Sequence, residues 1–320
     1  MQFFKSRSIT RCFVDGWKNI ALNHKQHLRF FWLPALLCAT ALGLCFAATL
    51  LFYHRTHQIF VLLDYVGGAT FNEMCELLQP FLSPLIAMLV GWIVALAGYC
   101  LIKGSMVTQI RLYRATDSLP AMSAWSLRKE IFKDTSRIFL FIVLRSAILC
   151  LLLAPIVWLA MNVTEWCWLP AFVLFVAIML PSSLLRMYYQ QHTLTLRQTL
   201  TKSLRKAMSG FGKWIVLKLM TGIFAILCYG ILLLPVFYVI LQTHAVAESS
   251  LLDPDVVLPP YFSSVMFITA FCAALLCTVI DLIVTWQNAL FIGSQHADEN
   301  VQEAAMPSPE TDGNAPAVEE

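Results

Sequence analysis

The chain has 320 residues, of which 59% are hydrophobic and only 13% are charged. Soluble domains carry about 25% charged residues, so this chain lacks the polar surface to face water on all sides. Its net charge of +3 is too small to indicate a nucleic-acid partner, and its 10 cysteines show no zinc-binding spacing. The composition predicts an all-α polytopic membrane protein, for which we expect no cofactor.

The N-terminal segment, residues 1–29, is basic and precedes the first apolar run. Between residues 8 and 24, apolar side chains recur at helical spacing while basic side chains fall elsewhere on the helix. This pattern predicts an amphipathic helix that lies on the cytoplasmic surface of a membrane.

Six apolar runs follow, and each is close to the ~20 residues that a helix needs to cross the hydrocarbon core. The runs comprise residues 30–53, 81–102, 138–161, 167–185, 214–242 and 261–286. They predict a transmembrane helical bundle at residues 30–292, with six spans in three hairpins. Runs this long and continuous lack the alternation of a membrane β-barrel.

Lys and Arg are distributed to one side of these runs. Nineteen of the 22 lie before the first run or in the loops after the second and fourth, whereas Arg55 alone lies in an opposite loop. Basic loops stay in the cytoplasm, so both termini are expected there, in a bacterial inner membrane. Residues 293–320 contain seven acids and no Lys or Arg, and predict a disordered cytoplasmic tail.

The basic loops repeat a short motif. Ser-Leu-Arg-Lys occurs at residues 126–129 and again at 203–206, each time ahead of a span with a proline in its outer half. We predict basic interfacial helices at residues 8–24, 126–137 and 203–213, one before each hairpin. The alternative is that the insertion rule alone makes these loops basic.

Three ionisable residues lie inside the predicted spans: Arg145, Lys218 and Asp281. Such residues usually face the interior of the bundle and pair, which makes them candidate functional residues. All three lie roughly 6–10 Å from the cytoplasmic ends of their spans. We therefore predict that Asp281 pairs with Arg145, with Lys218 alongside. The alternative for the two cations is that their side chains extend to the headgroups.

Other side chains suggest binding or packing. His54 and His57 follow the first span and His244 follows the fifth, at the outer side, where imidazoles could bind a metal or simply occupy the membrane interface. Cys75 and Cys167 are expected on the same side, where a disulfide could form. Residues 91, 95 and 98 are Gly, Ala and Gly, a small face suited to close helix packing.

The plan of basic stretches at residues 8–17, 126–137 and 203–213, each ahead of a hairpin, resembles uncharacterised six-span bacterial inner-membrane families. It is also similar to the membrane domain that precedes the catalytic domain in some glycerophosphodiester phosphodiesterases. The resemblance covers about residues 5–292. Because an acidic tail follows the spans here, the resemblance implies a membrane scaffold and no enzymatic residues.

No nucleophile motif or paired-carboxylate pattern indicates catalysis. The leading hypothesis is a non-enzymatic scaffold or accessory protein whose partners are anionic lipid headgroups and other membrane proteins. One alternative is a small permease, which a cavity lined by Arg145 and Asp281 would favour. Another is a membrane-embedded hydrolase, which a cluster of Ser, His or carboxylate groups at one interface would favour.

Overall fold

The computed structural model describes residues 2–66, 82–119, 123–162, 168–170, 172–175, 178, 211–252 and 258–305. Its long helices are α1 (Ile9–Leu22), α2 (His24–Val66), α4 (Leu82–Thr116), α5 (Arg128–Asn162), α8 (Phe211–Leu252) and α9 (Phe262–Ala305). The described residues contain no strand, which confirms the all-α prediction. Five of these helices, all but α1, are long and apolar enough to cross a membrane. The predicted fourth span, residues 167–185, lies largely outside the described residues.

Most helices extend well beyond the predicted spans. The first helix to cross begins at His24 and continues to Val66, and α4 continues to Thr116. The basic stretch at residues 126–137 is not a separate interfacial helix, because α5 begins at Arg128 and runs without a break. The apolar pattern marks where a helix meets hydrocarbon, but a helix continues into water wherever its polar side chains are solvated. The third predicted interfacial stretch, residues 203–213, lies mostly outside the described residues.

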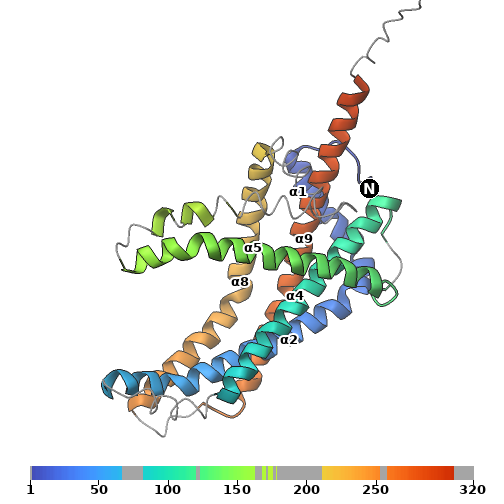
Figure 1. Cartoon of the computed structure of the whole chain (residues 1–320). Coiled ribbons are helices and arrows are strands. Elements are labelled where there is room, and N and C mark those ends of the chain that lie inside the picture. The colour runs from blue at the N-terminus through green and yellow to red at the C-terminus, as the bar shows by residue number, and fades with distance from the viewer. Residues whose placement is uncertain are drawn as a thin grey trace, which may run out of the picture.

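The helix at the C-terminal end also corrects a prediction. Residues from 293 were expected to be disordered, yet α9 continues to Ala305. Gly293 packs against the N-terminal residues, since an added Cβ would lie 3.0 Å from the ring of Phe3, and the Ser294 hydroxyl bonds to the backbone of Arg7. The N-terminus and the last turns of α9 lie at the same end of the molecule (Figure 1).

Helix α9 is the central element of the fold. It packs against α1, α2, α4 and α8, and it contributes to each of the three buried apolar clusters. The largest cluster contains the fully buried Trp286 together with Phe30 of α2, Met106 of α4 and Phe3 of the N-terminal segment. A second cluster joins α9 to Trp214 of α8 and Cys12 of α1. The third joins Met266, near the start of α9, to Ala47 and Leu50 of α2 and Val239 of α8.

Small residues set the close approach of α2 and α4. A Cβ on Gly98 would lie 3.1 Å from the Cα atom of Cys38, and one on Gly91 would lie 3.5 Å from the Cα atom of Cys45. Ala95, between them on the same face, is 2% exposed. The predicted small face is confirmed as a contact within the chain, where van der Waals packing between close backbones stabilises the helix pair.

Helix α1 is the amphipathic helix predicted from residues 8–24. The hydroxyl of Ser8 caps it by accepting a hydrogen bond from the amide of Arg11. It buries Cys12, Gly16 and Asn19 and packs against α8 and α9. Helix α5 packs against α4 and lies at a steep angle across it (Figure 1).

Candidate functional site

An ion pair between α4 and α9 is the main polar contact within the apolar helices. The Nζ atom of Lys103 lies 2.9 Å from Oδ2 of Asp281, and the two side chains are 9% and 29% exposed, respectively. An isolated charge at the centre of a membrane helix costs ~2.5–3.5 kcal/mol on insertion scales, so pairing offsets a substantial penalty. The pair therefore ties α4 to α9.

A third helix joins the same carboxylate. The hydroxyl of Tyr229, on α8, donates a hydrogen bond of 3.0 Å to Oδ1 of Asp281. The ammonium group of Lys103 also lies 5.4 Å from the centre of the Tyr99 ring, within the range of a cation–π contact. Both oxygens of Asp281 are thus occupied by side chains from two other helices.

This geometry corrects the predicted partner of Asp281. A cationic partner was expected and is present, but it is Lys103 and not Arg145. The predicted third member, Lys218, places its Nζ atom 4.6 Å from the ring centre of Trp214, one turn closer to the start of α8. That direction agrees with the alternative in which the Lys218 side chain extends toward the membrane surface.

Lys103 was expected in the cytoplasmic loop after the second span, so its pairing with Asp281 was not predicted. A signal was present, because the apolar run does not end at Ile102. After Lys103 the next charged residue is Arg111, and the intervening residues are mostly small or apolar. A single Lys inside an apolar run of that length is an ionisable residue within a span, and it needs a partner as Arg145 and Asp281 do. Tyr229 carried no comparable signal, since tyrosine is common in apolar helices.

Two of the predicted histidines, His57 of α2 and His244 of α8, lie near each other. The hydroxyl of Tyr53 lies 2.6 Å from Nδ1 of His244, and Nε2 of His244 lies 3.3 Å from a carboxylate oxygen of Glu248. The ring centres of His57 and His244 are 5.9 Å apart. His244 therefore uses Nδ1 in a contact that links α8 to α2, and Nε2 in a contact with Glu248 within α8.

Among the described residues, no group of three or more His, Cys, Asp or Glu side chains is arranged to hold a metal ion. The metal site expected from His54, His57 and His244 is thus not formed in this part of the chain. Cys75 and Cys167, the predicted disulfide, lie outside the described residues.

A further cluster fastens α4 to α5. The guanidinium of Arg111 lies 2.7 Å from a carboxylate oxygen of Glu130 and 3.3 Å from one of Asp134. The hydroxyl of Thr108 donates a 2.8 Å hydrogen bond to the same Asp134 oxygen. The backbones also come close here, because a Cβ on Gly104 would lie 2.9 Å from the backbone nitrogen of Thr135.

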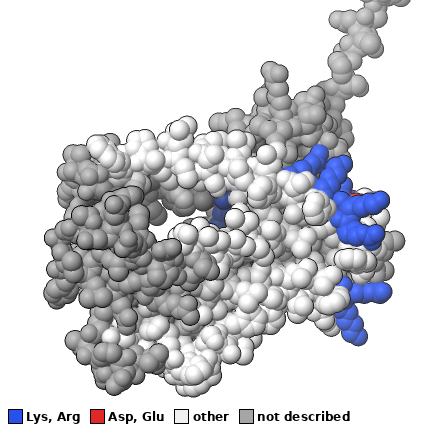
Figure 2. Space-filling view, turned by 60° about the horizontal axis from the view of Figure 1, so that its bottom comes forward, with Lys and Arg blue, Asp and Glu red and all other residues white. Residues whose placement is uncertain are grey.

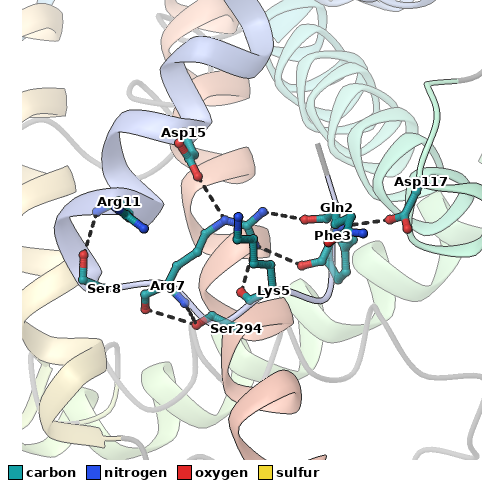
Figure 3. A network of polar contacts seen from close by, with 9 residues as sticks. All are labelled: Gln2, Phe3, Lys5, Arg7, Ser8, Arg11, Asp15, Asp117 and Ser294. Atoms are coloured by element: carbon teal, nitrogen blue, oxygen red, sulfur yellow. Dashed lines mark hydrogen bonds and ion pairs between the residues drawn. The ribbon is translucent and has the colours of Figure 1, made fainter.

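Arg7 organises the N-terminal segment (Figure 3). Its Nε atom donates to Asp15 at 3.0 Å, and its terminal nitrogens donate to the backbone oxygens of Gln2, Phe3 and Lys5. Its amide donates a 2.8 Å hydrogen bond to Ser294 of α9. The side chain is only 2% exposed, so this guanidinium has a structural role.

Beside this network lies a pocket of about 660 Å³ at the start of α1. Four cations and one carboxylate contribute to its wall, together with polar residues and one valine. The lining residues are Gln2, Lys5, Ser6, Arg7, Thr10, Arg11, Val14, Asp15 and Lys18. The basic character of this segment was predicted, but nothing in the spacing of its residues indicates a concave surface.

No protein-family model, curated protein or solved structure matches this chain. The resemblance to glycerophosphodiester phosphodiesterase membrane domains therefore remains an expectation based on the sequence pattern.

Proposed function

We propose that the chain is a six-span protein of a bacterial inner membrane, with three hairpins and both termini in the cytoplasm, that serves as a non-enzymatic scaffold or accessory protein. The resemblance to six-span bacterial families belongs to the same proposal. Its partners would be anionic lipid headgroups and other membrane proteins.

The main support is the use of the charged groups within the helices. Asp281 is held on one side by Lys103 and on the other by Tyr229, at 2.9 and 3.0 Å. These contacts join α4, α8 and α9 through one carboxylate. Polar side chains that bond across membrane helices stabilise helix association, typically by ~0.6–2 kcal/mol for each bond. A cluster arranged in this way serves to hold a bundle together.

The distribution of charge supports lipid headgroups as partners. Figure 2 shows Lys and Arg gathered toward one end of the visible face, while most of its remaining described surface is uncharged. Each Lys or Arg close to an anionic membrane surface contributes about 1 kcal/mol of attraction. A basic end of this kind positions the bundle and attracts anionic lipids around it.

The test is purification of the tagged full chain from native membranes in lipid particles, with mass spectrometry of the proteins and lipids that co-purify. A mock purification from cells without the tag is the control. We expect one or more membrane proteins in fixed proportion to the chain, together with anionic phospholipid. If no protein is enriched above the mock sample, the scaffold proposal is wrong.

A small permease is the second candidate, and one observation favours it. The side chain of Asp281 is 29% exposed although it lies in an apolar helix, and a carboxylate of this kind is a candidate contact for a small polar solute or ion. Vesicles containing the purified protein would be assayed for proton and cation flux with pH-sensitive and potential-sensitive dyes. A flux that disappears in a folded Lys103→Met/Asp281→Leu variant would replace the scaffold proposal with the permease.

A further inference from the structure

We infer that the pocket at the start of α1, lined by Lys5, Arg7, Arg11 and Lys18, binds a phosphate group such as that of an anionic phospholipid headgroup. The inference rests on the proposed cytoplasmic orientation of the basic end. It goes beyond general attraction of basic residues to a membrane, because it assigns the contact to one concave site.

The charge of the pocket is strongly one-sided. The carboxylate of Asp15 is already paired with Arg7 at 3.0 Å. Lys5, Arg11 and Lys18 are exposed and make no ion pair among the described contacts, although they line the same pocket. Three cations therefore face a shared space without a counter-charge, which is the arrangement that a phosphate group requires.

The pocket wall is held in place before any ligand binds. The buried guanidinium of Arg7 bonds to three backbone oxygens of residues 2–5, and so fixes the fold of this segment. The segment is tied to α9 through Ser294 and to the end of α4 through Asp117, which accepts a 2.8 Å hydrogen bond from the amide of Phe3. A preformed wall lowers the entropic cost of binding.

The backbone and neutral side chains add donors to the three cations. The amides at the start of a helix lack acceptors within the helix, and they carry partial positive charge. The Ser8 hydroxyl already accepts from the amide of Arg11, whereas Ser6 and Thr10 belong to the pocket lining and add hydroxyl donors. Phosphate oxygens accept from all of these groups.

The position of the pocket favours a lipid over a soluble anion. Trp17, on the same helix, is 40% exposed, and its ring centre lies 5.2 Å from that of Phe224 in the predicted fifth span. Val14, also 40% exposed, forms part of the pocket wall. Tryptophan in this setting is typical of the membrane interface. The volume of about 660 Å³ is also larger than one inorganic ion needs and falls within the range of organic ligand sites.

The test measures thermal unfolding of the purified full chain in neutral detergent. Short-chain phosphatidylglycerol and phosphatidylcholine are titrated in parallel, and inorganic phosphate and glycerol 3-phosphate form two further series. We expect a saturable rise in melting temperature with phosphatidylglycerol and none with phosphatidylcholine. A saturable rise with the soluble phosphates as well would still support a phosphate site, but would identify its source as soluble.

The decisive comparison uses two variants that lose the same charge. In the Lys5→Gln/Arg11→Gln/Lys18→Gln variant, the apparent affinity for phosphatidylglycerol should fall by about tenfold or more, since each lost contact near the surface contributes. The control, Lys25→Gln/Arg29→Gln/Lys129→Gln, removes exposed cations outside the pocket lining. It should bind almost as the wild type does.

Equal loss in the two variants would mean that net charge alone attracts the lipid, and would overturn the pocket assignment. So would a wild-type chain that responds to none of the four ligands. If the triple variant fails to fold, Lys18→Glu, with a control of Lys25→Glu, makes the same comparison with one exposed side chain each. The co-purification test of the scaffold does not depend on the pocket, so the two proposals fail separately.

Discussion

At the scale of single residues, the cost of placing the charged Asp281 carboxylate in an apolar helix depends on its ion pair with Lys103. Removing either partner leaves an unpaired charge in a mostly apolar setting, whereas removing both leaves none. We expect Lys103→Met and Asp281→Leu each to lower the free energy of unfolding by up to about 3 kcal/mol. The double variant should lose less than the sum, with a coupling of roughly 0.5–3 kcal/mol. Thermal and denaturant unfolding in detergent would measure the cycle.

The matched control is a second cycle between Arg145 and Asp281. Both oxygens of Asp281 are bonded to Lys103 and Tyr229, so the effects of Arg145→Leu and Asp281→Leu should add within about 0.5 kcal/mol. Coupling in the Arg145 cycle and additivity in the Lys103 cycle would mean that Asp281 pairs as the sequence analysis predicted, and not as the structure shows.

The residue scale also shows how far a sequence can identify such a cluster. Asp281 stood out because a carboxylate in an apolar run needs a partner, and that requirement depends on the residue alone. The identity of the partner depends on which faces of α4, α5 and α9 meet, which a single sequence does not show. Arg145 was predicted as the partner and Lys103 was placed in a loop, but the packing of α4 against α9 brings Lys103 to Asp281.

At the scale of elements, the junction of α4 and α5 depends on Gly104. A Cβ there would lie 2.9 Å from the backbone nitrogen and 3.0 Å from the Cα atom of Thr135, neither of which can move without shifting α5. Gly104→Ala should therefore lower the free energy of unfolding by about 1–3 kcal/mol, as overpacking does. It should also weaken the Arg111 and Thr108 contacts with Asp134.

Gly222→Ala on α8 is the control, because no atom lies within 4 Å of its added Cβ. Alanine favours a helix over glycine by ~1 kcal/mol, so this variant should be as stable as the wild type or more so. Melting temperatures in the same detergent give the comparison. If both variants melt alike, α5 does not pack closely against α4 at this point.

The elements themselves were predictable in kind but not in length. Apolar runs located α2, α4, α5, α8 and α9 because hydrocarbon tolerates few other side chains. Their ends were missed where polar segments continue the helix, as from Tyr53 to Val66 in α2 and from Gly293 to Ala305 in α9. Solvated polar residues form helices as readily as loops, so composition does not mark the boundary there.

At the scale of the whole molecule, two distant contacts constrain the number of membrane crossings. Arg7 and Ser294 share hydrogen bonds of 2.8 and 3.1 Å, so the two segments lie on the same side of the membrane. At the other end, Tyr53 of α2 meets His244 of α8. A chain that leaves a side and returns to it must cross an even number of times. The five described candidate spans are an odd number, so we predict one further crossing between residues 162 and 211.

We therefore predict that residues 167–185 form the fourth span and that both termini are cytoplasmic. Apart from Lys103, which is buried in α4, the basic residues outside the spans remain heavily biased to the predicted inner side, with Arg55 alone opposite. Reporter fusions at Thr164 and Ser249 should report the outer side, and fusions at Thr201 and Ser308 the inner side. Thr164 and Thr201 on the same side would remove the fourth span. The Arg7–Ser294 contact would then be incompatible with a chain that crosses at all five remaining helices, and one of those helices would have to lie outside the membrane.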